Sequence, residues 1–111
     1  MNSMTVGARA IELDKDGFLV DLSDWSPAVA SALAAAEDIE LTPEHWEVLE
    51  LLRNFYAEFQ LSPATRPLIK YTAMKLGAEK GNSIHLNRLF NGTPAKLAAK
   101  LAGLPKPTNC I

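Results

Sequence analysis

The chain has 111 residues, of which 48% are hydrophobic, so it fits a single domain that buries a core without cross-links. Its one cysteine excludes an intramolecular disulfide, and one cysteine with two histidines is too few at ligand spacing for a structural zinc site. The formal net charge of −2 hides an acidic half, residues 1–60 with three basic and twelve acidic side chains, and a basic half, residues 61–111 with eight and one.

The N-terminal stretch predicts no targeting signal. Residues 1–14 lack a basic stretch followed by an apolar run, so we expect no signal peptide. The alanine-rich run at residues 28–36 is far shorter than the ~20 apolar residues that span a bilayer. Prenylation needs three residues after the cysteine, and only Ile111 follows Cys110. We therefore expect a cytoplasmic protein with no membrane partner, and a lone cysteine suits that reducing compartment.

Alternating apolar and polar residues predict a small β-hairpin near the N-terminus. The alternation runs through residues 10–14 and resumes at residues 18–21. Between these two runs, Lys15-Asp16-Gly17 supplies the chemistry of a tight turn. The two runs are therefore the predicted strands.

About five helices follow, and most of them begin with a capping residue before a proline or an apolar run. The expected ranges are residues 27–38, 43–60, 66–78, 83–90 and 94–103. The caps predicted for the first, second, fourth and fifth helices are Ser26, Thr42, Ser83 and Thr93. The second helix has the clearest three-to-four spacing of apolar side chains, at Trp46, Leu49, Leu52 or Arg53, Tyr56 and Phe59.

These elements predict a mainly α (α+β) fold: a small N-terminal β-hairpin, a compact orthogonal bundle of about five helices and an extended C-terminal arm. Short connectors and unequal helix lengths favour orthogonal packing over long antiparallel pairs. We expect one helical domain with its hairpin over residues 1–102 and a flexible arm that carries the thiol over residues 103–111.

The arm follows from two prolines. Pro105 and Pro107 can neither continue a helix nor join the middle of a sheet, so they favour an extended strip. At ~3.1 Å per residue, the steps from Gly103 to Cys110 would let the sulfur travel ~20 Å. Such an arm can enter two pockets in turn, which predicts a carrier thiol rather than a stand-alone catalyst. The α-carboxylate of Ile111 disfavours the thiolate, so we expect a partner's site to activate Cys110.

Neither histidine has a sequence context that promises a base beside the thiol, and both His45 and His85 are predicted to be satisfied structural residues. Lone cysteines are commonly buried and inert, which is the competing interpretation of Cys110. A penultimate position behind two prolines makes deep burial harder, so we expect an accessible thiol.

The basic half predicts a positive surface that attracts an acidic protein or a nucleic acid. The alternative is a set of ordinary solvated helix faces balanced by the acidic half. The residues concerned are Arg66, Lys70, Lys75, Lys80, Arg88, Lys96, Lys100 and Lys106.

Several motifs together resemble the DsrC/TusE family. The most specific is GLPKP at residues 103–107 with a penultimate Cys110, and the others are DGFL at 16–19, LTPEHW at 41–46, RNFY at 53–56, PATR at 63–66 and LF at 89–90. The resemblance covers nearly the whole chain. Members that serve dissimilatory sulfur metabolism have a second cysteine eleven positions before the penultimate one, where this chain has Ala99. The sequence is therefore similar to the single-thiol TusE branch.

This resemblance implies a persulfide relay. A TusE-like protein accepts sulfane sulfur from a TusBCD-like complex and passes it to a MnmA-like thiouridylase, which 2-thiolates the wobble uridine of certain tRNAs. Cys110 carries over as the persulfide site, and Arg66, Lys70 and Lys106 as supporting basic residues. No metal or organic cofactor is implied.

Two other interpretations stay open. One keeps the family and changes the pathway, to an accessory DsrC-like sulfur carrier or a redox sensor. The other is a helix-turn-helix nucleic-acid module formed around Ser62-Pro63, with Arg66, Lys70 and Lys75 on the second helix. A sequence pI of about 5.6 disfavours this module and direct nucleic-acid binding.

Overall fold

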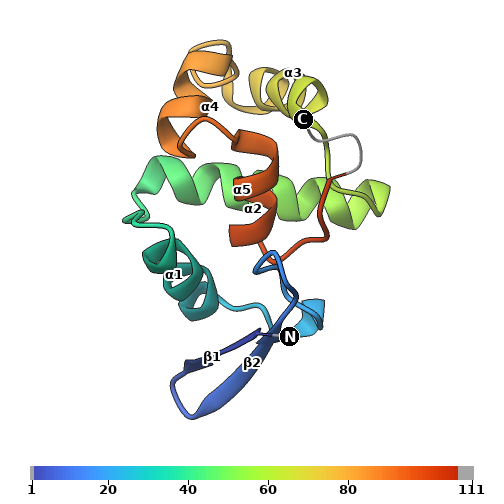
Figure 1. Ribbon diagram of the computed structural model, residues 1–111. Coiled ribbons are helices and arrows are strands. Elements are labelled where there is room, and N and C mark those ends of the chain that lie inside the picture. The colour runs from blue at the N-terminus through green and yellow to red at the C-terminus, as the bar shows by residue number, and fades with distance from the viewer. Residues whose placement is uncertain (1, 108–111) are drawn as a thin grey trace.

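A computed structural model describes residues 2–107. Within this range, a two-stranded hairpin precedes a 3-10 turn and five α-helices (Figure 1). The elements are β1 Asn2–Val6, β2 Arg9–Leu13, η1 Leu22–Asp24, α1 Pro27–Ala36, α2 Pro43–Phe59, α3 Thr65–Leu76, α4 Ser83–Leu89 and α5 Pro94–Leu101. The predicted fold class, a small hairpin followed by about five helices, is confirmed.

The predicted hairpin is present, but its position in the sequence is wrong. β1 pairs antiparallel with β2 from Asn2 opposite Leu13 to Val6 opposite Arg9, and the chain reverses at Gly7-Ala8. Past the predicted turn at residues 15–17, only a single bridge joins Leu13 to Leu19. The side chains there do not alternate, because Phe18 and Leu19 are both buried in the core. An amphipathic strand cannot place consecutive side chains on one face.

Helix starts follow the expected capping chemistry with small shifts. The Ser26 hydroxyl accepts a hydrogen bond from the amide of Val29, as predicted for α1. The cap of α4 is Asn82 rather than Ser83, since the Asn82 side chain accepts from the amide of His85 at 2.9 Å. Asparagine is among the best N-cap residues, and a second capping residue directly after it obscured the boundary.

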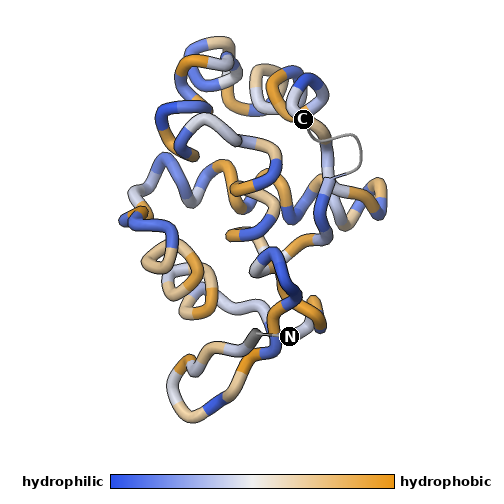
Figure 2. The backbone as a smooth tube through the Cα atoms, in the orientation of Figure 1, coloured by the Kyte–Doolittle hydropathy of each residue, from blue (hydrophilic) through white to orange (hydrophobic). Residues whose placement is uncertain are grey.

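Helix α5 forms the centre of the bundle. Six of its eight residues are buried, and it contacts α1, α2, α3 and α4. Alanine at positions 95, 98 and 99 leaves room for the neighbouring helices to approach closely. Apolar residues recur along α2 and α5 where the two helices cross (Figure 2). Of the other two residues of α5, Lys96 is exposed and Lys100 is half-buried.

Two apolar side chains lie on the surface, and for Phe59 this contradicts its predicted place in the apolar stripe of α2. Ile84 is 78% exposed and Phe59 is 48% exposed. Helix α4 has only seven residues and buries the face formed by His85, Leu86 and Leu89, which leaves Ile84 on the opposite side. Phe59 ends α2 beyond the reach of the core and contacts the ring of Phe55 at 4.6 Å between centroids.

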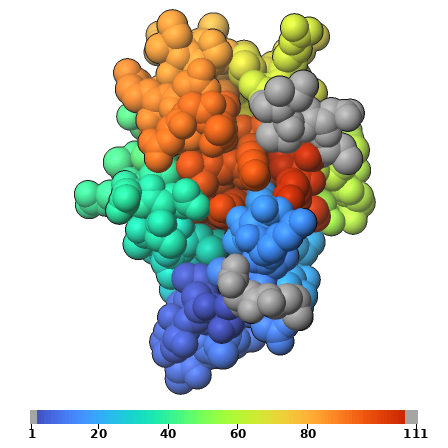
Figure 3. Space-filling model, viewed as in Figure 1, coloured from blue at the N-terminus to red at the C-terminus, as the bar shows by residue number. Residues whose placement is uncertain are grey.

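A Schellman motif ends α5 and turns the chain sharply. The amide of Gly103 donates to the carbonyl of Lys100, and the amide of Leu104 donates to that of Ala99. Gly103 has φ +74°, a left-handed conformation that glycine adopts without strain. Leu104 and Pro107 are buried. The described part of the predicted arm, residues 103–107, therefore packs on the body (Figure 3).

Replacing Gly103 by alanine should cost more stability than the same change at Gly92. Both glycines have positive φ, so each alanine is strained by about 1–2 kcal/mol. A Cβ at Gly103 would lie 2.2 Å from Cδ1 of Trp25, whereas a Cβ at Gly92 meets nothing within 4 Å. We expect Gly103→Ala to lose about 1–3 kcal/mol beyond the loss in Gly92→Ala, measured by urea unfolding. Equal losses would show that Trp25 does not confine this turn.

Candidate functional site

The site predicted from the sequence centres on Cys110, which lies outside the described residues. What the structure describes is the approach to it, residues 103–107, called here the C-terminal segment. The segment lies between the turn at residues 14–20 and the C-terminal end of α2 (Figure 3). Three sets of contacts hold it there.

The first set joins Trp25 and Arg53 to the end of α5. The indole Nε1 of Trp25 donates to the carbonyl of Leu101 at 2.9 Å. The guanidinium of Arg53 lies 3.9 Å from the centroid of the Trp25 ring and donates to the carbonyl of Ala102 at 2.7 Å. These bonds satisfy carbonyls that a helix end leaves without partners. Burial lowers the pKa of Arg53 below its ordinary value.

The second contact comes from the linker between α2 and α3. The hydroxyl of Ser62, a buried residue, donates to the carbonyl of Pro105 at 2.6 Å. Pro105 has no amide hydrogen, so its carbonyl is the only backbone hydrogen-bonding group that it offers. Ser62 therefore fixes the middle of the C-terminal segment against the end of α2.

The third contact is an ion pair between Lys106 and Asp16. Asp16 sits in a turn in which the carboxylate of Asp14 accepts hydrogen bonds from the amides of Asp16 and Phe18. The Nζ of Lys106 also lies 5.8 Å from the centroid of the Phe18 ring. The hydrogen bond with Lys106 lowers the pKa of Asp16 below 3.8, and the same bond raises the pKa of Lys106 above 10.5.

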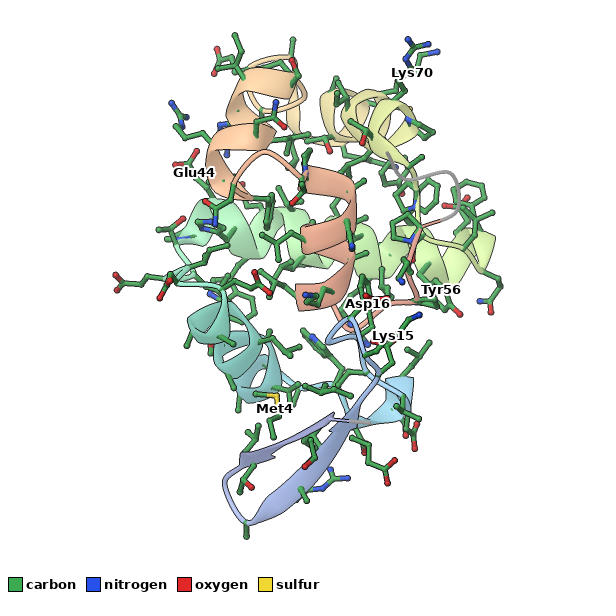
Figure 4. The ribbon with its side chains drawn as sticks, viewed as in Figure 1. Met4, Lys15, Asp16, Glu44, Tyr56 and Lys70 are labelled. Atoms are coloured by element: carbon green, nitrogen blue, oxygen red, sulfur yellow. The ribbon has the colours of Figure 1, made fainter. Side chains whose placement is uncertain are left out.

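The three basic residues predicted as supporting do not gather at one place. Arg66 and Lys70 are exposed on α3, one turn apart. Figure 4 shows Lys70 pointing away from the body, well separated from Asp16, the partner of Lys106. Among the described residues, neither Arg66 nor Lys70 forms a hydrogen bond or ion pair. Of the three, only Lys106 contacts the elements that hold the C-terminal segment.

His45 is a satisfied structural histidine, as predicted. Its Nδ1 accepts from the amide of Thr42 at 3.1 Å, so Nε2 carries the proton and donates to the carbonyl of Leu89 at 2.8 Å. Both ring nitrogens are thus occupied, and His45 ties the start of α2 to the end of α4. It has no free nitrogen to serve as a base.

His85 is also buried, but among the described residues only one of its two ring nitrogens has a hydrogen-bond partner. Its Nδ1 lies 3.2 Å from a guanidinium nitrogen of Arg88. Its Nε2 is buried without a hydrogen-bond partner and lies 3.5 Å from a carboxylate oxygen of Glu44. The prediction of a fully satisfied His85 is therefore wrong, because α4 places it beside the first turn of α2, where the carboxylate stops short of hydrogen-bonding distance.

Two cavities adjoin α2. One of about 520 Å³ lies between α2 and α3 and is lined by side chains that include Glu47, Glu58 and Tyr71. Another of about 320 Å³ lies beside Trp25, Trp46 and Arg53. Within residues 2–107, no group of three or more His, Cys, Asp or Glu side chains is arranged to hold a metal ion. None of the described helices combines the length and apolar character needed to cross a bilayer.

Sequence reasoning assigned no role to four residues that hold the C-terminal segment: Asp16, Trp25, Arg53 and Ser62. The sequence predicts Asp16 as part of a hairpin turn and Arg53 as a possible member of the apolar stripe of α2. One feature of the sequence does indicate a role for Arg53: it is a charged residue among apolar helix positions, and a charged group there needs a partner. No local pattern identifies carbonyl groups of residues 101–105 as that partner, because they are distant in sequence.

Comparison with known proteins places the chain among sulfur proteins. A family model described as "DsrC like protein" matches residues 5–111. The chain is 54% identical over 103 residues to the sulfurtransferase TusE of Salmonella choleraesuis, covering 93% of this chain and 94% of that protein. It is 50% identical to the sulfurtransferase TusE homolog of Haemophilus influenzae, covering 97% and 99% of the two chains.

Solved structures agree with these matches. The NMR structure of Allochromatium vinosum DsrC has a TM-score of 0.90 and 45% identity, covering 99% of this chain and 98% of that one. The crystal structure of the oxidized γ-subunit of dissimilatory sulfite reductase (DsrC) from Archaeoglobus fulgidus has a TM-score of 0.85 and 36% identity, covering 99% and 100%. The matches favour a sulfur protein over the helix-turn-helix alternative.

The Asp16–Lys106 ion pair should stabilise the fold only within a defined pH range. The lowered pKa of Asp16 means that its contribution is present above pH 3.8 and is lost as pH falls through the folded value. The raised pKa of Lys106 means that its contribution is present below pH 10.5 and is lost as pH rises through the folded value. We expect Asp16→Asn to be less stable than the wild type between pH 3.8 and pH 10.5, in urea unfolding at low salt. The two proteins should become equally stable once the pH has passed the folded pKa of Asp16 or of Lys106.

Glu12→Gln is the matched control, because the exposed Glu12 side chain forms no hydrogen bond or ion pair with the described residues. It removes one carboxylate and should show no such pH window. A stability difference for Asp16→Asn that persists unchanged at pH 3 would contradict the ion pair as its cause.

Proposed function

Since the chain belongs to the family of DsrC-like proteins, we propose that it is a sulfur carrier whose working group is the thiol of Cys110. The sulfurtransferase names of its relatives support a sulfur-relay role. The family match extends through residue 111, so it includes Cys110. That observation carries the proposal, because Cys110 is the one thiol that the chain has to offer.

The proposed chemistry is thiol exchange in two steps. The Cys110 thiolate attacks the outer sulfur of a donor cysteine persulfide, the S–S bond breaks, and the donor cysteine leaves as a thiolate. Cys110 now holds the persulfide. An acceptor cysteine thiolate attacks its outer sulfur in turn, and Cys110 leaves as a thiolate. The sulfane sulfur moves without a net redox change, so the carrier needs neither an oxidant nor a cofactor.

A one-thiol mechanism agrees with the residue at position 99. The resemblance to DsrC proteins of dissimilatory metabolism places their second cysteine there, and this chain has Ala99, which is fully buried in α5. Without a second thiol, Cys110 cannot close an intramolecular disulfide. Its sulfur can then be discharged only to another molecule, which is the behaviour of a relay protein.

For the donor we propose a TusBCD-like complex, and for the acceptor a MnmA-like thiouridylase with its tRNA bound, in the cytoplasm. Arg66 and Lys70 are exposed cations on α3, and they would assist by attracting an acidic partner surface or the phosphates of the tRNA. An accessory sulfur carrier for another pathway uses the same thiol chemistry. The two differ in the acceptor, which the tests below distinguish.

Cys110→Ser should abolish sulfur acceptance and leave the fold intact, because a hydroxyl cannot form a persulfide. After incubation with inorganic polysulfide, mass spectrometry of the wild type should show one added sulfur on the C-terminal peptide. The serine variant should show none, and deletion of residues 109–111 should behave likewise. A melting temperature several degrees lower in Cys110→Ser would instead indicate a thiol that packs in the core.

Deletion of the gene should reduce 2-thiouridine at the wobble position of tRNA, measured by mass spectrometry of digested nucleosides. Complementation with the wild type should restore it, and Cys110→Ser should not. Lys70→Ala should restore it at least partly, because Lys70 is assigned only an electrostatic role. Unchanged tRNA thiolation in the deletion strain, together with normal loading of Cys110 in vitro, would favour the accessory carrier.

A further inference from the structure

We propose that Asp16 and Arg53 are positioning residues for the Cys110 thiol, because Arg53 holds Ala102, directly before the C-terminal segment, and Asp16 holds Lys106 within it. This inference rests on the proposed function and adds to it. Each acts through the chain that leads to Cys110: Arg53 through the carbonyl of Ala102, and Asp16 through the side chain of Lys106.

Arg53 provides the inner anchor. It joins α2 to the end of α5 through its bond to the carbonyl of Ala102 and its stacking on Trp25. Trp25 in turn bonds to Leu101 and fills the space where a side chain at Gly103 would stand. Arg53 and Trp25 are half-buried, and the carbonyls that they bond lie at the buried end of α5. Opening this anchor would leave a charged group and two carbonyls without their partners. The inner anchor is therefore the harder of the two to open.

Asp16 provides the outer anchor. Its partner Lys106 is the last charged residue before Cys110, and the side chains of Asp16 and Lys106 are 29% and 45% exposed. An exposed ion pair is weak and is screened by salt. Its position is nevertheless well defined, since the carboxylate of Asp14 orders the turn that presents Asp16. The outer anchor therefore holds Lys106 at a defined position, but the ion pair is easily broken.

The outer anchor shortens the tether of the sulfur. Counted from Lys106, four steps separate the anchor from Cys110, which allow at most ~14 Å of fully extended chain. When Lys106 is released, Ser62 still holds Pro105, and the five steps from there allow ~18 Å. Holding Lys106 thus confines the thiol to a smaller volume, and a confined group loses less entropy when it enters a partner's pocket.

Spin labelling tests the positioning directly, because Cys110 is the only cysteine and takes a nitroxide without further mutation. In the wild type at low salt, the label should tumble more slowly than in Asp16→Asn, by about twofold in rotational correlation time. The charge swap, Asp16→Lys combined with Lys106→Asp, should restore the slower motion. Glu12→Gln should leave it unchanged, and ~0.5 M salt should make the wild type resemble Asp16→Asn.

Sulfur transfer supplies the functional readout. Persulfide transfer from loaded Cys110 to a MnmA-like acceptor should show a KM about two- to fivefold higher in Asp16→Asn, with kcat within twofold of the wild type. Arg53→Gln should raise KM by about tenfold, and Arg53→Lys should recover part of that loss. Loading by inorganic polysulfide should not change in any of these variants, because a small donor needs no docking geometry.

The outcomes separate this inference from the proposed function. If the wild type fails to load with polysulfide, the proposed function fails, whereas the spin-label result still decides whether Asp16 and Arg53 position residue 110. Label motion that does not respond to Asp16→Asn, or that the charge swap fails to restore, overturns the positioning role of Asp16. The same KM in Arg53→Gln and wild type overturns the role of Arg53, provided that the variant keeps the wild-type circular dichroism spectrum.

Discussion

The buried end of helix α5 is the constraint on which the rest of the structure depends. Helices α1, α2, α3 and α4 all contact α5. The carbonyl groups of Leu101 and Ala102 accept hydrogen bonds from Trp25 and Arg53, which are far away in sequence. Because these carbonyls are satisfied by fixed side chains, the chain can leave α5 in only one direction. The left-handed Gly103 makes that direction possible.

This constraint links the core to the chemistry. A sulfur carrier has to present one thiol to different proteins, which requires reach, and it has to present it in a reproducible place, which requires order. Under the proposed function, residues 103–107, which pack on the body, would supply the order, and the three further steps to Cys110 would supply the reach. The turn at residues 14–20 and the end of α2 supply the two surfaces between which the segment lies.

The electrostatic halves of the molecule also have a structural use. The acidic N-terminal half contributes Asp16, Glu37 and Glu47, and each pairs with a lysine of the basic half, Lys106, Lys100 or Lys80. Part of the opposite charge of the two halves is therefore paired within the molecule and does not contribute to a surface for partners. Among the described residues, Arg66 and Lys70 take part in none of these pairs, which is consistent with the role that we propose for them.

The number of helices, most helix boundaries and the thiol that we assign as the working group could be predicted from the sequence. These features depend on local signals: a capping residue before a proline, apolar side chains at three-to-four spacing, and a cysteine at the end of the chain. Strand pairing was predicted less well. The alternating residues 18–21 follow β2 and have the pattern of a strand, so they were predicted as the partner of β2. Its true partner, β1, lacked a comparable pattern.

The residues that hold the end of α5 and the C-terminal segment could not be predicted from the sequence, because they are brought together by tertiary packing. Arg53, Trp25 and Ser62 meet carbonyl groups that lie between 43 and 76 residues away along the chain. A carbonyl group has no sequence signature, so no motif can reveal such a bond in advance. Asp16 was visible as a turn residue, but its pairing with Lys106 across 90 residues depended on how the turn packs against α5 and the segment that follows it.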